Sequence, residues 1–243
     1  MTGLQEKVAL ITGADGGIGR ALARRLAAEG CRLVLHSHDE QGLAKAVADE
    51  GLPAERVLTS VHDVADSEAV AASVAVALER FGRIDHLLNV AGVAYPGGIL
   101  TTSREVWDRT VATNLTGYFV AAAAVLPHMK EAGSGHIVNM SSIWGRRAAA
   151  PGGGLAYSAS KWGVEGLTRG LAEEARPWGV RVTGIVLDKV DTNFSENMPV
   201  TLTAEQRARM LAAEDVAEAT YAVLASSSRA QISTVELDAW LWR

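Results

Sequence analysis

Tyr157 and Lys161 stand four residues apart in a segment with a helical pattern. On a helix both side chains lie on one face, about 6 Å apart along the axis. A phenol needs about 4 kcal/mol of preferential phenolate stabilisation to titrate near 7 instead of 10, and one ammonium at about 4 Å supplies that at an effective dielectric constant of about 20. We therefore expect Lys161 to lower the pKa of Tyr157. The alternative is a surface tyrosine beside a solvated lysine.

The segment 12–19, TGADGGIG, joins a short apolar run to a helical pattern. Its glycines at 13, 17 and 19 permit a tight turn and let backbone N–H groups approach a pyrophosphate. The spacing is G-x-x-x-G-x-G, and its place after the first apolar run predicts a nucleotide-binding loop. A glycine turn that serves packing alone is the alternative.

Short apolar runs alternate with longer helical patterns along nearly the whole chain. We expect strands at 8–12, 32–36, 56–60, 86–90, 136–140, 180–186 and 232–237, and helices at 18–29, 40–50, 67–81, 104–130, 156–177 and 215–226. Strands such as 8–11, VALI, are apolar throughout, as expected when helices cover both faces of a sheet. The pattern predicts an α/β fold, a doubly wound Rossmann-type parallel sheet of about seven strands with helices on both faces.

No repeat, low-complexity tract or linker divides the chain, so we expect a single domain over 1–243. The segment 187–210 has little strand character and is long for a plain connection, which predicts a lid over the substrate site. The run 151–154, PGGG, reads as a flexible bend before a helix.

The composition, 48% hydrophobic and 21% charged, is typical of a globular protein. With 28 acidic and 23 basic residues the net charge is -5, so no overall positive field favours nucleic acid as a partner. The uncharged stretch 110–129 contains Asn, Thr, Pro and His and is too polar for a membrane span.

Cys31 is the only cysteine, which excludes an intrachain disulfide and a thiolate metal cage. No export signal is recognisable, so we expect a cytoplasmic protein.

Several separated motifs resemble those of the short-chain dehydrogenase/reductase family, over essentially the full chain. The loop 12–19 is similar to its TGxxxGxG element, and the sequence NVAG at 89–92 resembles its NNAG element. The resemblance also covers HDV at 62–64, TNL at 113–115, Ser142, the YxxxK pair of Tyr157 and Lys161, and Thr192 after VD.

This resemblance implies hydride transfer between a nicotinamide cofactor and a carbonyl or alcohol. Tyr157 would be the general acid or base, Ser142 would stabilise the reacting oxygen, and Lys161 would hold the nicotinamide ribose and lower the pKa of Tyr157. Asn114 would anchor a water that links Lys161 to solvent. The residues implied in cofactor binding are Gly13, Asp15, Gly17, Ile18, Gly19, Ser37, His38, Asp63, Val64, Asn89, Ala91, Gly92, Tyr157, Lys161 and Thr192.

Three departures from the family pattern concern the site. Leu187-Asp188 stands where relatives commonly have Pro-Gly, Ser142 and Tyr157 are fifteen residues apart instead of about thirteen, and the sequence LDAW at 237–240 replaces the usual Asp-Gly-Gly. We expect a changed wall beside the nicotinamide and a longer pocket rim. The residues expected to edge the substrate are Tyr95, Trp144, Arg146, Phe194 and Met198.

Cofactor choice depends on the end of the second strand, where an acidic residue favours NAD. Ser37 occupies that position with His38 next to it, which favours NADP(H); Asp39 could instead reach the ribose if the strand runs longer, so NAD(H) stays possible. His36 and His38 share a strand face, but no further ligand cluster accompanies them, so we expect no metal.

The preferred function is an NADP(H)-dependent carbonyl reductase or alcohol dehydrogenase that acts on a small molecule and forms a homo-oligomer, a tetramer or a dimer, as relatives often do. The five tryptophans outside the substrate rim are expected in packing or interfaces. One alternative is a nucleotide-bound sensor or scaffold without turnover. Another is a lyase like the halohydrin dehalogenases, although that group lacks the nucleotide loop and usually carries Arg in place of Lys161.

Overall fold

Seven parallel strands form one sheet in the order β3-β2-β1-β4-β5-β6-β7. The structure, a computed structural model, describes residues 3–149, 152–194 and 201–242. The strands are β1 (Val8–Thr12), β2 (Arg32–Ser37), β3 (Val57–Val61), β4 (His86–Asn89), β5 (Gly135–Ser142), β6 (Val180–Leu187) and β7 (Thr234–Leu237). The chain order reverses between β1 and β4, so the carboxyl ends of these two strands bound the crevice where α/β folds bind their ligands.

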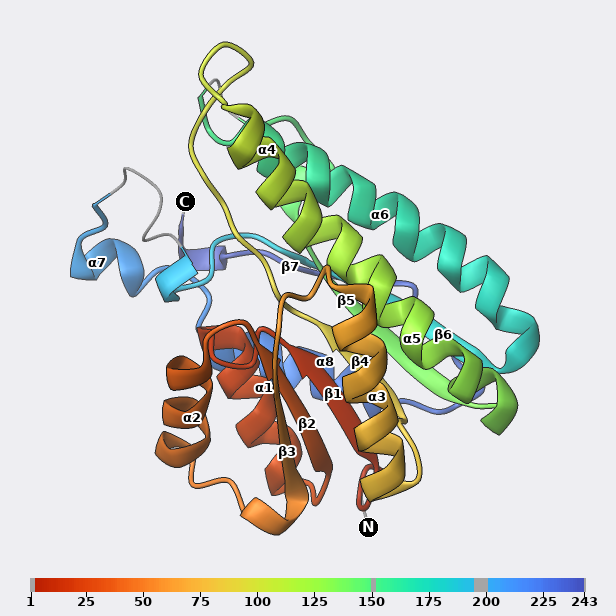
Figure 1. Ribbon diagram of the computed structural model, residues 1–243. Coiled ribbons are helices and arrows are strands. Elements are labelled where there is room, and N and C mark those ends of the chain that lie inside the picture. Colours follow the sequence, from red (N-terminus) through yellow and green to blue (C-terminus); the bar gives the residue numbers. More distant parts are fainter. Residues whose placement is uncertain (1–2, 150–151, 195–200, 243) are drawn as a thin grey trace.

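Helices cover both faces of this sheet (Figure 1). They are α1 (Gly17–Ala28), α2 (Glu40–Asp49), α3 (Ser67–Phe81), α4 (Arg104–Val111), α5 (Gly117–Ala132), α6 (Leu155–Ala175), α7 (Ala204–Arg207) and α8 (Ala213–Leu224). Helices α1, α2 and α8 enclose one hydrophobic core, and α3, α5 and α6 enclose the other. The predicted fold class is confirmed.

Strand β1 shows why its sequence is apolar without alternation. Ala9 and Ile11 lie in the core under α1 and α8, whereas Val8 and Leu10 lie in the core under α3 and α5. All of these side chains are buried, so both faces of the strand exclude water, as in other parallel sheets.

The predicted helix over 104–130 is divided by a wider turn. Residues Ala112–Thr116 form a π-helical turn between α4 and α5, in which Gly117 N–H donates to the carbonyl of Ala112, five residues back. A period of 3.6 residues cannot distinguish such a turn from a regular helix, and π-turns are frequent at functional sites.

Two further predictions on elements need correction. The last strand begins at Thr234 and not at 232, and the segment 187–210 is not without regular structure. Leu187 ends β6, where it pairs with Ser142 and Leu237, and Ala204–Arg207 forms the short helix α7. Met198 and its neighbours 195–200 lie outside the described residues.

By length and hydropathy alone, the helical stretch Arg104–Ala132 could cross a membrane. Core helices of soluble proteins pass the same test. Here Val125 and Met129 are fully buried in the core beneath α5, so packing against the sheet accounts for the apolar composition of the stretch.

Candidate active site

The loop between β1 and α1 is shaped by glycines that no larger residue could replace. Gly13 has a left-handed φ of +66°, and a Cβ there would lie 2.8 Å from the Cα atom of Ala91. A Cβ on Gly19 would lie 2.2 Å from the carbonyl oxygen of Gly13. The close approach of these backbones explains the glycine spacing, and the N-terminus of α1 behind the loop favours an anionic group.

Thr12 ties this loop to the one after β4. Its hydroxyl oxygen accepts hydrogen bonds from Val90 N at 3.0 Å and Ala91 N at 3.1 Å. The threonine before the glycines therefore fixes the distance between the two predicted nucleotide-binding loops, a role that the sequence pattern alone did not reveal.

The segment after β6 returns to the same loops. A Cβ on Gly17 would lie 2.7 Å from Cγ2 of Thr192, so these residues are in direct contact. A ring carbon of Phe194 lies 3.6 Å from where a Cβ on Gly92 would be. Predicted cofactor residues from three distant stretches of sequence therefore meet at the carboxyl edge of the sheet.

Tyr157 lies in the first turn of α6, between two aromatic rings. Its ring centroid is 5.9 Å from that of Trp144, which is packed edge-on, and 5.6 Å from that of Phe194. Ser142 lies close enough to Tyr157 to act on the pKa of its phenol, and Ser142 Oγ accepts from Trp144 N at 3.2 Å. The end of β5 thus places a hydroxyl beside the phenol, and two of the predicted substrate residues flank it.

Lys161 lies one turn further along α6, but its ammonium is not bonded to the Tyr157 phenol. Lys161 Nζ donates to the carbonyl oxygen of Met140 at 2.8 Å and lies 5.7 Å from the centroid of the Tyr157 ring. Burial lowers the pKa of Lys161 to about 7, with Glu165 acting in the opposite sense. Burial also raises the pKa of Tyr157 to about 12, although the nearby Ser142 hydroxyl acts to lower it.

The expected lowering of the Tyr157 pKa by Lys161 is therefore wrong for this arrangement. The sequence argument placed a full ammonium about 4 Å from the phenolate at an effective dielectric constant of about 20. In the structure desolvation disfavours the charged forms of both groups, which raises the tyrosine pKa and lowers the lysine pKa. At neutral pH the phenol holds its proton.

Asn114 is fully buried in the π-helical turn. Its amide accepts from Val93 N at 2.8 Å and donates to Val93 O at 2.9 Å and to Ser160 Oγ at 3.0 Å. Ser160 Oγ in turn donates to the carbonyl of Tyr157 at 2.7 Å. Asn114 thus connects the loop after β4 to the first turns of α6, and its expected water-holding role stays a prediction.

At the end of β2, Ser37 is buried and its hydroxyl accepts from Asp39 N at 3.0 Å, while His38 is exposed. The strand ends at Ser37, one residue later than expected. A Cβ on Gly42 would lie 2.5 Å from Oδ2 of Asp39, so that carboxylate lies against the first turn of α2. His36 is buried behind them, with Nε2 2.9 Å from the carbonyl of His62, and burial lowers its pKa to about 4.

The other predicted cofactor residues line the same edge. Asp63 follows β3 and is exposed, with its carboxylate accepting from Ala65 N at 2.8 Å, and Val64 packs against Gly117 at the start of α5. Asp15 and Ile18 are half-buried in the glycine loop and the first turn of α1.

Asn89 at the end of β4 is buried and turned toward the sheet interior. Its amide nitrogen donates to Asn139 Oδ1 at 2.9 Å, and Asn139 donates to Thr168 Oγ1 at 2.9 Å. This chain of side chains braces β4, β5 and α6 beneath the site.

Arg146 does not join the aromatic residues around Tyr157. Its guanidinium pairs with Glu165 at 3.2 Å and with Glu236 at 2.8 Å. These pairs turn it toward a separate cavity of about 480 Å³, lined also by Ile143, Arg147, Asp188, Asp238, Ala239, Trp240 and Trp242. Asp188, which replaces the glycine of the family pair, faces this cavity.

Tyr95 reaches the site through its backbone. Its carbonyl oxygen lies 3.1 Å from where a Cβ on Gly154 would be, immediately before α6, whereas its ring lies 6.0 Å from the guanidinium carbon of Arg109. Of the predicted substrate residues, the structure therefore brings the side chains of Trp144 and Phe194 to Tyr157.

These residues fit a dinucleotide and acid–base chemistry. The glycine cradle admits a close backbone approach, and beyond it a protonated phenol, a hydroxyl and an amine lie side by side. Within residues 3–149, 152–194 and 201–242, no group of three or more His, Cys, Asp or Glu side chains could hold a metal ion.

A family model described as "short chain dehydrogenase" matches residues 7–202. The chain is 41% identical to levodione reductase of Leifsonia aquatica over 81% of this chain and 74% of the relative. It is 39% identical to trans-4-hydroxycyclohexanecarboxylate dehydrogenase of Sinomonas cyclohexanicum (79% and 76% covered). It is 34% identical to 2,5-dichloro-2,5-cyclohexadiene-1,4-diol dehydrogenase of Sphingobium indicum (85% and 82% covered).

Solved structures show the same similarity. The crystal structure of levodione reductase has a TM-score of 0.87 at 36% identity, with 97% of each chain covered. A metagenomic short-chain oxidoreductase in complex with NADP has a TM-score of 0.80 at 33% identity, with 96% of this chain and 97% of that one covered. The 3-ketoacyl-(acyl-carrier-protein) reductase from Brucella melitensis, complexed with NADH, has a TM-score of 0.86 at 29% identity, with 99% and 100% covered.

Proposed function

The chain belongs to the short-chain dehydrogenase/reductase family and is an NAD(P)-dependent oxidoreductase, and from that premise we propose that it reduces a ketone with NADPH. The observation that carries the proposal is the position of Tyr157, which lies beside Ser142 and is enclosed by Trp144 and Phe194.

The nicotinamide would supply the hydride, and this chain would supply the proton and its placement. The Tyr157 phenol, protonated at neutral pH, donates its proton to the carbonyl oxygen as negative charge develops there. Ser142 stands beside that phenol and donates a hydrogen bond to the same oxygen. In the reverse direction Tyr157 accepts the proton of the alcohol.

Lys161 and Asn114 act around this pair. Lys161 holds the nicotinamide ribose and, when charged, favours the phenolate form of Tyr157 after proton transfer. Asn114 keeps the loop after β4 and the start of α6 in register through Val93 and Ser160. The residues proposed to cradle the pyrophosphate are Gly13, Gly17 and Gly19, with Thr192 on the nicotinamide side.

We favour NADP(H) over NAD(H) on the residues at the end of β2. Ser37 presents no carboxylate there, and His38 is exposed beside it. Asp39, the one acidic group that could select NAD, lies against α2 at Gly42. Both cofactors occur among the similar structures, which makes the local residues the better guide.

The proposed substrate is a cyclic ketone or its secondary alcohol. Two relatives are named for six-membered ring substrates, a hydroxycyclohexanecarboxylate and a cyclohexadienediol. The rings of Trp144 and Phe194 on either side of Tyr157 offer flat apolar walls that suit such a ring.

The experiment is a fluorescence or calorimetric titration with NADPH and NADH, followed by a panel of cyclic and open-chain ketones, aldehydes and alcohols. We expect tighter NADPH binding and oxidation of NADPH with cyclic ketones, followed by its absorbance. If neither cofactor binds, the proposal is wrong. Binding without turnover on any substrate would favour a sensor.

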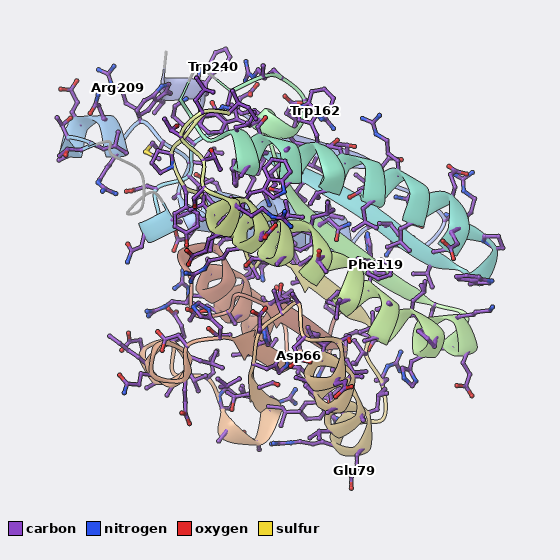
Figure 2. All side chains as sticks on the ribbon, turned by 45° about the horizontal axis from the view of Figure 1, so that its top comes forward. Asp66, Glu79, Phe119, Trp162, Arg209 and Trp240 are labelled. Carbon is purple, nitrogen blue, oxygen red and sulfur yellow. The ribbon has the colours of Figure 1, made fainter. Side chains whose placement is uncertain are left out.

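We also expect a cytoplasmic homo-oligomer. Phe119 on α5 and Trp162 on α6 are 58% and 53% exposed, on the helical layer outside the sheet (Figure 2). We expect aromatic side chains of this size to be covered in the oligomer. Size-exclusion chromatography with light scattering would show a dimer or tetramer; a monomer would contradict this expectation.

A further inference from the structure

Tyr118 lies on α5 directly beside Lys161, although nothing in the family motifs marks it. Its side chain is fully buried, and its hydroxyl donates to the carbonyl oxygen of Met140 at 3.2 Å. Lys161 Nζ donates to that same carbonyl at 2.8 Å. Lys161 Nζ also lies 3.5 Å from the Tyr118 hydroxyl oxygen and 5.1 Å from the centroid of its ring. The three groups form a closed triangle of polar contacts.

Lys161 depends on few groups for its charge, because only 4% of it is exposed. In the described part of the chain, the titratable groups that face it are Tyr157 and Glu165 on α6 and Tyr118 on α5. From β5 it meets the neutral carbonyl of Met140. Glu165 is shared with Arg146, which pairs with its carboxylate at 3.2 Å. Tyr118 and the Met140 carbonyl are therefore the groups that the Lys161 ammonium contacts by hydrogen bonds.

Tyr118 stays uncharged, because burial raises the pKa of its phenol above its ordinary value. A neutral tyrosine supports a nearby ammonium in two ways. The oxygen accepts a charge-assisted hydrogen bond, and the face of the ring attracts the cation. When the lysine loses its proton, the cation–π attraction is lost and the hydrogen bond is no longer charge-assisted.

We propose that Tyr118 is a positioning residue for Lys161. The hydroxyl and ring of Tyr118 hold the Lys161 ammonium against the Met140 carbonyl of β5 and keep it charged beside Tyr157. The inference rests on the proposed function, because it concerns how Lys161 is prepared for that reaction. Tyr118 acts through Lys161 and contacts neither substrate nor cofactor.

The test replaces Tyr118 with Phe, which removes one oxygen atom and keeps the ring. Competitive acetylation with acetic anhydride over a pH series, followed by peptide mass spectrometry, reports the titration of Lys161 and needs no cofactor or substrate. In the wild type we expect a pKa of about 7 for Lys161. In Tyr118→Phe we expect titration about one unit lower. Tyr118→Met, which removes the ring as well, should lower it further.

Tyr221→Phe is the matched control. This tyrosine lies on α8, outside the site, with the guanidinium carbon of Arg25 3.7 Å from its ring centroid. Its loss of a hydroxyl should leave the titration of Lys161 unchanged. A merely structural role of Tyr118 would lower the thermal unfolding temperature of Tyr118→Phe and leave Lys161 titrating as in the wild type, which would overturn the inference.

The pH dependence of kcat/KM is a second measurement, and the inference predicts the direction of its shift. A charged Lys161 favours the phenolate that forms as Tyr157 gives up its proton, so in ketone reduction kcat/KM of Tyr118→Phe should fall to half its maximum about one unit lower in pH than in the wild type. If the wild type shows no turnover but Lys161 shifts in the variant, the proposed function fails and the inference stands. If turnover is present and neither the titration nor the profile moves, only the inference fails.

Discussion

The two ends of the crevice are built by different means. At the proposed nucleotide end, between β1 and β2, shape comes from the backbone, where Gly13 and Gly19 bring main chains closer than any Cβ would allow. At the proposed catalytic end, between β4 and β6, shape comes from buried side chains that bond to one another, with Asn114 and Lys161 at the centre. The first end excludes side chains, and the second is filled with them.

This difference determines how each end should respond to mutation. A backbone cradle fails when any atom is added, because there is no space for it. A network of buried polar groups fails when an atom is removed, because its partner is left unsatisfied. Substitutions that add atoms at one end and remove atoms at the other therefore test the comparison.

The largest effect is expected from removing the Tyr157 hydroxyl. Tyr157→Phe should reduce kcat by about 10²–10⁴-fold, because the proton donor is lost, while the Kd for NADPH stays within about threefold, since the pyrophosphate cradle is untouched. Steady-state kinetics and fluorescence titration measure the two quantities. Retained turnover would remove Tyr157 from its role.

Adding one carbon at the glycine loop should instead weaken cofactor binding. In Gly19→Ala the new Cβ would lie 2.2 Å from the Gly13 carbonyl, and overpacking of this kind costs about 1–3 kcal/mol. We expect cofactor affinity to fall about 10–100-fold, measured by calorimetry.

Gly166→Ala is the control for that variant. Gly166 lies in α6, and nothing stands within 4 Å of the position that its Cβ would take. Cofactor affinity should be unchanged, and the thermal unfolding temperature unchanged or slightly raised, because alanine favours a helix. Equal effects of the two substitutions would contradict the steric account of the loop.

A smaller effect is expected at the end of β2. Ser37→Asp places a carboxylate at the end of β2, which should repel a 2′-phosphate and change the ratio of NADPH to NADH affinity by about tenfold, or 1.4 kcal/mol. Asp39→Asn should leave the ratio unchanged because its carboxylate lies against α2. If Asp39→Asn alters the ratio and Ser37→Asp does not, the assignment of positions at this strand end is wrong.

The smallest effect is expected at Arg146, whose guanidinium is engaged by Glu165 and Glu236 away from Tyr157. Arg146→Ala should change kcat/KM by less than about threefold and the free energy of unfolding by about 1 kcal/mol or less, since the side chain is partly exposed. A large rise in KM would return Arg146 to the substrate rim where the sequence placed it.

The same contrast explains what the sequence could predict. The glycine loop is local, since its glycines lie close together in the chain, so its place between β1 and α1 and the doubly wound sheet could both be predicted from pattern. The catalytic network joins residues from 89 to 168, and the direction of each side chain depends on packing. Neither the wide turn at 112–116 nor the meeting of Tyr118 with Lys161 leaves a periodic signal.

The pKa of Tyr157 could not be predicted from its spacing to Lys161 for a related reason. Four residues on a helix fix the distance along the axis, but not the dielectric surroundings or the competing partners of the amine. Met140 and Tyr118 take the hydrogen bonds of Lys161. Burial then governs the pKa of both residues.

The wide turn at Ala112–Thr116 gives α5 a register that a regular helix would not have. If the same five residues were wound as regular α-helix, everything beyond them would rotate by about 100° about the helix axis, because the wide turn holds one residue more than an α-turn. Tyr118 would then leave Lys161, and the hydrophobic stripe of α5 would turn away from the sheet. The extra residue of this one turn therefore decides which face of α5 meets the sheet and Lys161.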